Sequence, residues 1–424
     1  METKKKGFPA AFWVCACTEI FERLAYYLGR SLILIFVTAS VATGGLGLSD
    51  TVAANMQSNL TAFSYLLPLF GAVIVDKYIG ARYTTPVGMF IAAAGYFTGG
   101  IAKSSAGVYA MIFLVSLGLA LFKNGAIIGR VITDKSQMDP AFSMRYTLVN
   151  VGAFIGTFLV GILYKDVFAK DGVLGFAPCF KMAALMMVLG GLWYIFVCWR
   201  FLGDLGKLPF KKTLTEEEKA AEAKKKEETG TKQPLTTIEK KRIGAIFVAS
   251  LFSIVFWIFW YLGYMPVYFY WAENMDWVVA GYQVPSTWFD AANSLFCVIL
   301  GPVTAALWKK LAARPQGDMS LFRKTGLGIA IIGVGYLFYA AIDIMRGGEK
   351  ASVLWLIVFA FLLTMGEMFF SPLGHSFISK YSPSRYLAVM MSVWGFATFI
   401  AAKSYGPVYG LSLIHISEPT RLDV

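Results

Sequence analysis

The chain has 424 residues, of which 57% are hydrophobic and only 15% are charged, with a net charge of +12. A soluble domain carries about 25% charged residues, so this composition and the mean hydropathy of +0.61 exclude an ordinary soluble globular protein. The positive charge does not indicate nucleic-acid binding, because the basic residues gather in alternate loops between apolar runs.

Apolar runs of about 20 residues recur along the chain, and each can cross a hydrocarbon core roughly 30 Å thick. Few polar residues interrupt them, which favours helices over a transmembrane barrel, whose strands alternate in segments of about ten residues. The sequence predicts an all-α polytopic membrane protein. Its eleven predicted spans are at about 12–38, 55–75, 83–101, 107–130, 142–164, 179–202, 243–271, 286–308, 325–344, 352–379 and 386–410.

Lys and Arg residues mark one side of the membrane. If the amino terminus with Lys4, Lys5 and Lys6 is cytoplasmic, the basic loops alternate with outer loops that hold few such residues, and 39–54 and 272–285 hold none. This is the positive-inside bias of membrane proteins. It predicts a multi-pass protein of the cell membrane, in contact with the lipid bilayer and without a nucleic-acid partner, whose amino terminus is cytoplasmic.

A polar and charged linker at 203–242 divides the spans into two sets. Six spans lie in 1–202 and five lie in 243–410. Two helical bundles joined by a cytoplasmic linker are the arrangement of a major facilitator transporter, which has six helices in each bundle. The sequence therefore predicts this fold, with the twelfth helix missing from the chain.

The end of the chain differs from the rest. Residues 411–421 have a mixed pattern, and Pro419 stands where a twelfth helix would begin. This stretch resembles the translation of a transposase adapter used in preparing sequencing libraries. We therefore expect 411–424 to be a non-native tail, with a short natural tail as the alternative.

The first span carries charges that a lipid-facing helix would not tolerate. The residues that share one face at helical i, i+3 and i+4 spacing are Glu19, Glu22, Arg23, Tyr26, Tyr27 and Arg30. Charged side chains inside a membrane are costly unless they are paired or hydrated. This face is therefore expected to point to the protein interior.

Lys123 is the next charge within an apolar run. The first span runs outward and the fourth runs back, so Lys123 lies at a depth similar to that of Glu19 and Glu22, roughly 10 Å from the cytoplasmic end. Protonation of a carboxylate in such a cluster would release a cation and change which salt bridges exist. The alternative is a static ion pair that fixes helix packing.

The second half holds fewer charges within its spans. Glu367 lies deep in the tenth span, which indicates a partner for a substrate ammonium, with a protonated carboxyl bonded within its own helix as the alternative. Asp290 and Asn293 share a face of the eighth span. The five cysteines have no metal-ligand spacing, and no nucleophile–base pair appears, so we expect neither a metal site nor an enzyme.

Together these residues resemble the proton-dependent oligopeptide transporters, a branch of the major facilitator superfamily. The pattern E-x-x-E-R followed by two tyrosines and an arginine is typical of that family, and the likeness extends over the chain to about residue 410. The other stretches that carry the resemblance are 71–82, 121–123, 146–154, 288–296 and 366–372.

The resemblance implies roles for individual residues. It implies that protons are coupled to transport through Glu19, Glu22, Arg23 and Lys123. It implies that basic residues bind the peptide carboxylate and Glu367 the amine. The residues implied for substrate binding are Tyr26, Tyr27, Arg30, Tyr65, Lys123, Asn150, Asn293, Glu367, Ser371 and Trp394. No cofactor is implied besides a proton gradient, and the expected partners are small peptides and protons, bound by a monomer.

The chain departs from the family at two places. Tyr261 and Leu262 stand where the family usually has an acid and a glutamine, and that acid pairs with the arginine equivalent to Arg30. We expect Asp290 to compensate for it. After Lys123, Asn124 replaces the usual proline or small residue, and glycine follows where asparagine is usual.

The resemblance implies a proton-coupled symporter that imports di- and tripeptides by alternating access. One alternative is a transporter of the same fold with another small cargo, such as nitrate, an amino acid or an organic acid. Another is a sensor that binds peptides without moving them. The intact first-span motif and Glu367 favour an amine-bearing cargo linked to protons.

Overall fold

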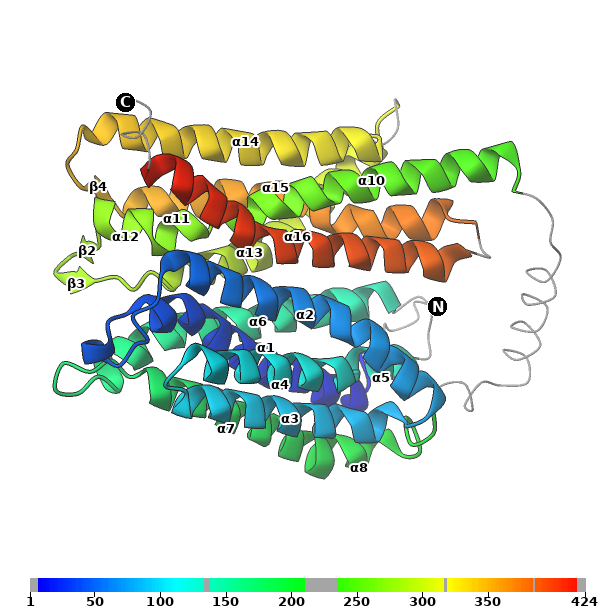
Figure 1. Cartoon of the computed structure of the whole chain (residues 1–424). Helices are drawn as coiled ribbons and strands as arrows, with labels where there is room; N and C mark the ends of the chain where they lie inside the picture. The colour runs from blue at the N-terminus through cyan, green and yellow to red at the C-terminus, as the bar shows by residue number, and fades with distance from the viewer. Residues whose placement is uncertain (1–6, 133–137, 210–234, 316–318, 384–385, 418–424) are drawn as a thin grey trace. The chain divides into compact units, whose positions relative to one another are not determined.

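The computed structural model describes residues 7–132, 138–209, 235–315, 319–383 and 386–417 (Figure 1). Helices account for most of this part of the chain, which confirms the predicted all-α class. The four strands that the described residues form have two residues each. A helix or a run of helices covers each of the eleven predicted spans, and their bounds differ from the predicted ones mainly at the ends.

The first six predicted spans correspond to eight helices. Their bounds are α1 (Ala10–Thr38), α2 (Asp50–Lys77), α3 (Ala81–Ile101), α4 (Ser105–Leu121), α5 (Asn124–Val131), α6 (Met138–Ile162), α7 (Phe176–Trp193) and α8 (Trp199–Leu202). A 3₁₀ turn at Val41–Thr43 follows α1, and π-helical turns at Leu163–Val167 and Tyr194–Cys198 follow α6 and α7.

The later spans correspond to a second series of helices. Their bounds are α10 (Thr237–Leu262), α11 (Met265–Tyr268), α12 (Tyr270–Asn274), α13 (Trp288–Ala312), α14 (Leu321–Arg346), α15 (Leu354–Tyr381) and α16 (Leu387–Ser417). β1 (Met275–Asp276) pairs in parallel with β4 (Ala351–Ser352), and β2 (Val278–Val279) pairs antiparallel with β3 (Tyr282–Gln283).

Contacts between residues group the chain into two compact units. Unit 1 consists of Met1–Leu32, Ser40–Leu46 and Leu67–Leu214, and unit 2 of Ile33–Ala39, Gly47–Leu66 and Thr215–Val424. The continuous helices α1 and α2 therefore each contribute residues to both units. The division into bundles 1–202 and 243–410 with a linker at 203–242 stays a prediction from the sequence, as does the non-native tail at 411–424.

Glycines bring helices of unit 1 into close contact. α4 and α7 both lie against α3 (Figure 1). A Cβ atom added at Gly88 of α3 would lie 2.4 Å from the carbonyl oxygen of Gly118 of α4, and the reverse approach is equally short. In a membrane, small residues at an interface let helix backbones approach and gain van der Waals contact.

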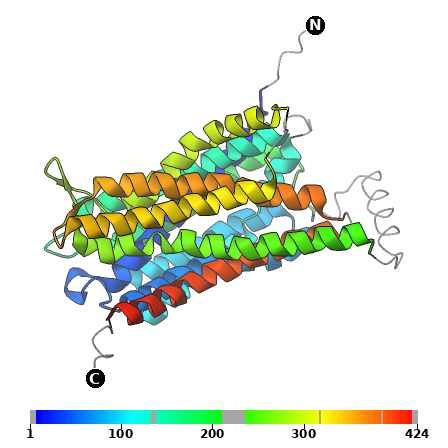
Figure 2. The same cartoon turned by 90° about the horizontal axis from the view of Figure 1, so that it is seen from above.

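In unit 2, α14 and α15 lie side by side (Figure 2), and α16 packs against α10. The first half of α2 also packs on α16. The Ser58 hydroxyl donates hydrogen bonds to the carbonyl oxygens of Ala402 at 2.7 Å and Lys403 at 3.0 Å. Gly406 permits this approach, because a Cβ atom there would lie 2.8 Å from the carbonyl oxygen of Ala54.

The sequence predicts one continuous helix over the fourth span, 107–130, but the structure has two helices there. α4 ends at Leu121 and α5 begins at Asn124, with Phe122 at ψ 102° and Lys123 at φ −123° between them. A break inside a membrane leaves backbone groups that need other partners. The backbone N–H of Lys123 finds one in the Thr85 hydroxyl at 3.4 Å.

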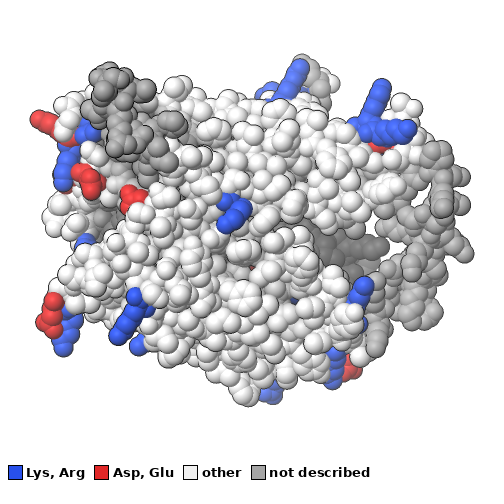
Figure 3. Space-filling model, in the orientation of Figure 1, with Lys and Arg blue, Asp and Glu red and all other residues white. Residues whose placement is uncertain are grey.

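Six helical stretches among the described residues are long and apolar enough by composition to cross a membrane, and α4 and the first part of α15 are shorter apolar helices. α1 is absent from these six because four charged residues, Glu19, Glu22, Arg23 and Arg30, lie within its apolar run. Figure 3 shows a face that is mostly uncharged, with Lys, Arg, Asp and Glu concentrated toward the helix ends. This pattern is typical of surfaces that contact lipid.

Candidate functional site

The charged face of α1 belongs to unit 1 from Glu19 to Arg30. Glu19 is 2% exposed, Glu22 is 1% exposed and Arg30 is 6% exposed, so these side chains are removed from the surface. The guanidinium of Arg30 lies over the ring of Tyr27, 5.9 Å from its centroid. Burial of this kind requires that the charges find partners within the protein.

Glu22 forms a bidentate ion pair with Arg23, its neighbour in sequence. Arg23 Nε and Nη2 each lie 2.5 Å from one carboxylate oxygen. The Arg23 guanidinium also lies 4.7 Å from the ring centroid of Tyr26, which packs edge-on against Tyr27. Bidentate pairs of this type fix geometry as well as charge. The pair and both tyrosines lie on α1 alone.

Glu19 is paired with residues of two other helices. Arg145 of α6 donates from Nε to Oε1 of Glu19 at 3.0 Å. Asn124, the first residue of α5, donates from Nδ2 to the same oxygen at 3.1 Å and to the carbonyl oxygen of Cys15 at 2.8 Å. Asn124 is fully buried. Glu19 therefore connects α1, α5 and α6.

Sequence reasoning missed both partners of Glu19 as site residues. The sequence pattern did not single out Arg145, and it marked Asn124 only as a departure from the family pattern. The available signal was that departure, because a polar amide beside Lys123 within an apolar run needs a polar partner. No comparable signal marks Arg145, since the pairing joins residues that are far apart in sequence.

Lys123 lies at the break between α4 and α5. Its ammonium group donates to the carbonyl oxygen of Pro68 of α2 at 2.8 Å. The ion pairs that the structure describes at Glu19 and Glu22 are those with Arg145 and Arg23. The break between α4 and α5 brings the Lys123 side chain into contact with α2. A continuous helix over 107–130, as the sequence predicts, does not include this break. A role for Lys123 in coupling stays a prediction.

Unit 2 holds a buried carboxylate on α15. Glu367 is 9% exposed and accepts a hydrogen bond from Asn293 Nδ2 at 3.2 Å, while the same amide donates to the Thr364 hydroxyl at 2.8 Å. The Cys297 thiol lies 3.9 Å from Oε2 of Glu367. Both donors lie on α13 and are neutral. Glu367 and Asn293, both predicted as substrate-binding residues, are therefore brought together.

Two consecutive aromatic residues of α10, Trp260 and Tyr261, have different neighbours. The indole N–H of Trp260 is buried near Glu367 but is outside hydrogen-bond geometry. The next residue, Tyr261, stacks on Tyr405 of α16 with ring centroids 4.8 Å apart. The family pattern has an acid at this position. Here Tyr261 fills it with an aromatic ring that packs on α16.

Asp290, the predicted compensating acid, is also in unit 2. It is 6% exposed and accepts a hydrogen bond from the hydroxyl of Tyr268. A buried carboxylate that accepts from a phenol is partly compensated for its lost hydration. Its relation to the charges of α1 stays a prediction.

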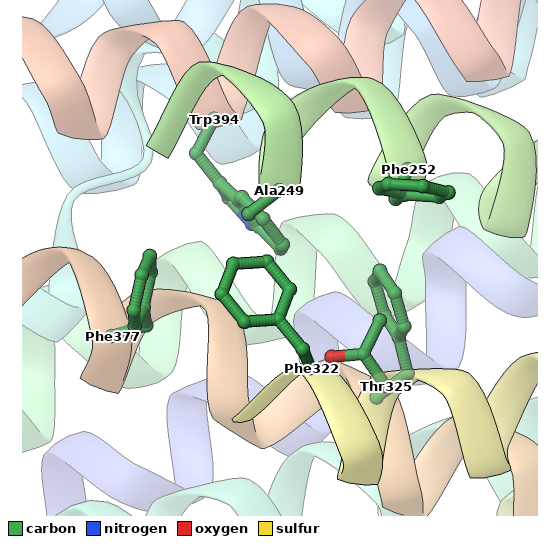
Figure 4. Close-up of a pocket in the computed structure, with 7 residues that line it drawn as sticks. Ala249, Phe252, Phe322, Thr325, Phe377 and Trp394 are labelled. Carbon is green, nitrogen blue, oxygen red and sulfur yellow. The ribbon is translucent and has the colours of Figure 1, made fainter. Parts of the chain in front are cut away.

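Trp394 lines an apolar pocket within unit 2, and Figure 4 shows its side chain beside Ala249, Phe252, Phe322 and Phe377. Its ring also stacks on Phe370, with centroids 6.1 Å apart. The lining residues come from α10, α14, α15 and α16. Trp394 thus has an aromatic packing environment, and its role in substrate binding stays a prediction.

The remaining predicted binding residues lie in different surroundings. The side chain of Tyr65 is 44% exposed on the part of α2 that belongs to unit 2. Asn150 of α6 donates to the carbonyl oxygen of Tyr146 one turn earlier at 3.0 Å. Ser371 is part of α15, but its side chain lies outside the part that the structure describes. In the described residues, no group of three metal-ligating side chains occurs.

Comparisons with known proteins extend over most of the chain. The sequence profile of the POT family (PTR2) matches residues 204–412. The uncharacterized transporter YclF of Bacillus subtilis (strain 168) is 25% identical over 439 residues, covering 94% of this chain and 87% of the relative. A di-/tripeptide transporter of Lactococcus lactis subsp. cremoris is 24% identical over 440 residues, covering 92% and 86%.

Solved structures agree with these sequence matches. A crystal structure of a mutant of the peptide transporter POT in complex with sulfate has a TM-score of 0.81 and 25% identity, covering 95% of this chain and 89% of that one. A POT family transporter in complex with 5-aminolevulinic acid has the same fold, with a TM-score of 0.82, 24% identity and coverage of 96% and 92%. The chain is a multi-pass membrane protein, and its sequence and fold support its assignment to the POT family, the proton-dependent oligopeptide transporters.

Proposed function

We propose that this chain is a proton-coupled symporter that imports di- and tripeptides by alternating access. The observation that carries the proposal is the environment of Glu367. This carboxylate is buried, and the donors described around it, from Asn293 and Cys297, are neutral. A buried carboxylate without a cation is costly, and the amino group of a peptide would supply the missing charge.

Unit 1 supplies the opposite charge. Arg30 and Lys123 are cations within predicted spans, and they are the groups we assign to the peptide carboxylate. A zwitterionic peptide carries one charge of each sign, and the need for both signs favours short peptides over cargoes with a single charge. The names of the di-/tripeptide transporters among the relatives support the same cargo.

The paired glutamates of α1 supply the coupling. A proton bound at a carboxylate changes which ion pairs can form, and a membrane potential of about 100 mV adds roughly 2.3 kcal/mol for each charge moved. Rocking of two helical bundles about a central site is the motion typical of such transporters. We place the protein in the plasma membrane as a monomer with a cytoplasmic amino terminus.

Uptake by proteoliposomes tests the proposal. Purified protein is reconstituted, a pH gradient that is acidic outside is imposed, and accumulation of radiolabelled dialanine is followed. We expect accumulation that a protonophore abolishes, and competition by di- and tripeptides but not by free amino acids or nitrate. Accumulation that ignores the pH gradient would contradict proton coupling, and binding without accumulation would indicate a sensor.

A further inference from the structure

Two residues outside the predicted site converge on Glu19 within unit 1. Arg145 Nε lies 3.0 Å from Oε1 of Glu19, and Asn124 Nδ2 lies 3.1 Å from the same oxygen. We propose that Arg145 and Asn124 are positioning residues that hold Glu19 as a fixed anion, and that Glu22 is the glutamate of α1 that carries the coupled proton. This inference rests on the proposed function.

The amide of Asn124 has a defined orientation. Nδ2 bonds to the carbonyl oxygen of Cys15 and to the carboxylate of Glu19, which lie one turn apart on α1. Rotation of the amide by a half turn would place Oδ1 against two acceptors. Oδ1 is instead buried without a described partner. The first residue of α5 is therefore tied to α1 by its N–H groups.

The packing of α6 on α1 places Arg145. A Cβ atom at Gly152 would lie 2.8 Å from the carbonyl oxygen of Ile20, and one at Gly156 would lie 2.5 Å from that of Leu24. Arg145 precedes Gly152 by seven residues, which is two turns on the same face. The close backbone contact thus sets the distance between the Arg145 guanidinium and Glu19.

Glu22 has a different environment. Its ion pair is with Arg23 on the same helix, so protonation of Glu22 releases a guanidinium without separating helices. Loss of the charge of Glu19 would instead leave the Arg145 guanidinium of α6 without its counter-ion and would weaken the hydrogen bond from Asn124. Among the described residues, the charged and titratable groups that interact with Glu19 are Glu22 on α1, Arg145 on α6 and the Cys15 thiol. Arg23 pairs with Glu22, and the Cys198 thiol interacts with that of Cys15.

Substitution of Arg145 alone, or of Arg145 together with Glu19, distinguishes a fixed anion at Glu19 from a proton carrier. A buried charge that loses its partner is strongly destabilising, whereas replacement of both partners by uncharged groups is often tolerated. Arg145→Met alone should therefore lower uptake and gradient-free counterflow together. If Glu19 is only a fixed anion, the double variant Glu19→Gln/Arg145→Met no longer needs either charge and should recover both activities.

The test measures pH-driven dialanine uptake, its dependence on external pH, and counterflow in proteoliposomes. We expect Arg145→Met to lose about tenfold or more in both assays. The double variant should return to within about threefold of the wild type with the same pH profile, and Arg145→Lys should also retain activity. Glu22→Gln should lose gradient-driven uptake and keep counterflow. The matched control is the exposed pair Asp204→Asn/Lys207→Met, which should change neither assay.

Other outcomes would overturn the inference. A double variant that performs counterflow but ignores the pH gradient would identify Glu19 as the proton carrier, and unchanged transport in Arg145→Met would remove its positioning role. If the double variant does not fold, the charge-reversed pair Glu19→Arg/Arg145→Glu replaces it. This variant has no acid at position 19, so proton-driven uptake by it would assign the proton to Glu22, and its loss with intact counterflow would assign the proton to Glu19. Absence of proton-driven uptake in the wild type would instead refute the proposed function.

Discussion

Lys403 on α16 donates a hydrogen bond to the side-chain oxygen of Asn59 on α2, within unit 2. Lys403 lies within a predicted span and is exposed, whereas Ala402 and Tyr405 beside it are fully buried. Most other exposed residues that the structure describes on this helix, such as Phe396, are apolar. Asn59 is the hydrogen-bond acceptor that the structure describes for this ammonium group.

We expect Asn59→Leu to destabilise the protein by about 1–3 kcal/mol, because it leaves an ammonium group without its acceptor inside the membrane. The double variant Asn59→Leu/Lys403→Met should recover most of this loss. Thermal unfolding in detergent measures the double-mutant cycle. Lys350→Met, at an exposed lysine before β4, is the control and should have little effect. Additive effects of the two single substitutions would contradict a stabilising contact.

Gly156→Leu should separate α6 from α1. A Cβ atom at this position would lie 2.5 Å from the carbonyl oxygen of Leu24, and overpacking of a helix contact costs about 1–3 kcal/mol or more. The melting temperature of the purified protein should fall. The matched control is Gly333→Leu on α14, where a Cβ atom meets nothing within 4 Å. Equal effects of both substitutions would argue against the close contact.

Glu367→Gln should weaken the binding of peptides with a free amino group. A hydrogen bond to a charged group contributes about 1.5–3 kcal/mol, which corresponds to a rise in KM of roughly tenfold or more. Uptake of dialanine at several concentrations measures the change. Cys297→Ala removes a more distant donor, 3.9 Å from the carboxylate, and is the control. An unchanged KM in Glu367→Gln would remove the assignment of Glu367 to the peptide amine.

Lys123→Met should abolish pH-driven accumulation of dialanine while some counterflow persists. The substitution removes the ammonium group that donates to Pro68 at the break between α4 and α5, and the positive charge assigned to coupling is lost with it. The two assays in proteoliposomes are compared at the same protein density. Lys103→Met changes an exposed lysine between α3 and α4 and serves as the control. Intact proton-driven uptake in Lys123→Met would contradict its role.

The sequence by itself determined the class of the protein and the face of α1 that carries charge. Apolar runs of this length span a membrane as helices, because every backbone polar group in lipid must be bonded within the segment. Glu19, Glu22 and Arg30 were found for the same reason, since charges within such a run need partners and spacing along one helix shows which residues share a face.

Only the tertiary structure decided which partners those charges have. Arg145 reaches Glu19, and Asn59 reaches Lys403, from helices that are distant in sequence. The break at Lys123 was equally hidden, because its freed N–H is bonded by Thr85 of another helix. Helical periodicity fixes the rotation of residues within one helix, whereas contacts between helices depend on their separation and depth, which close glycine packing sets.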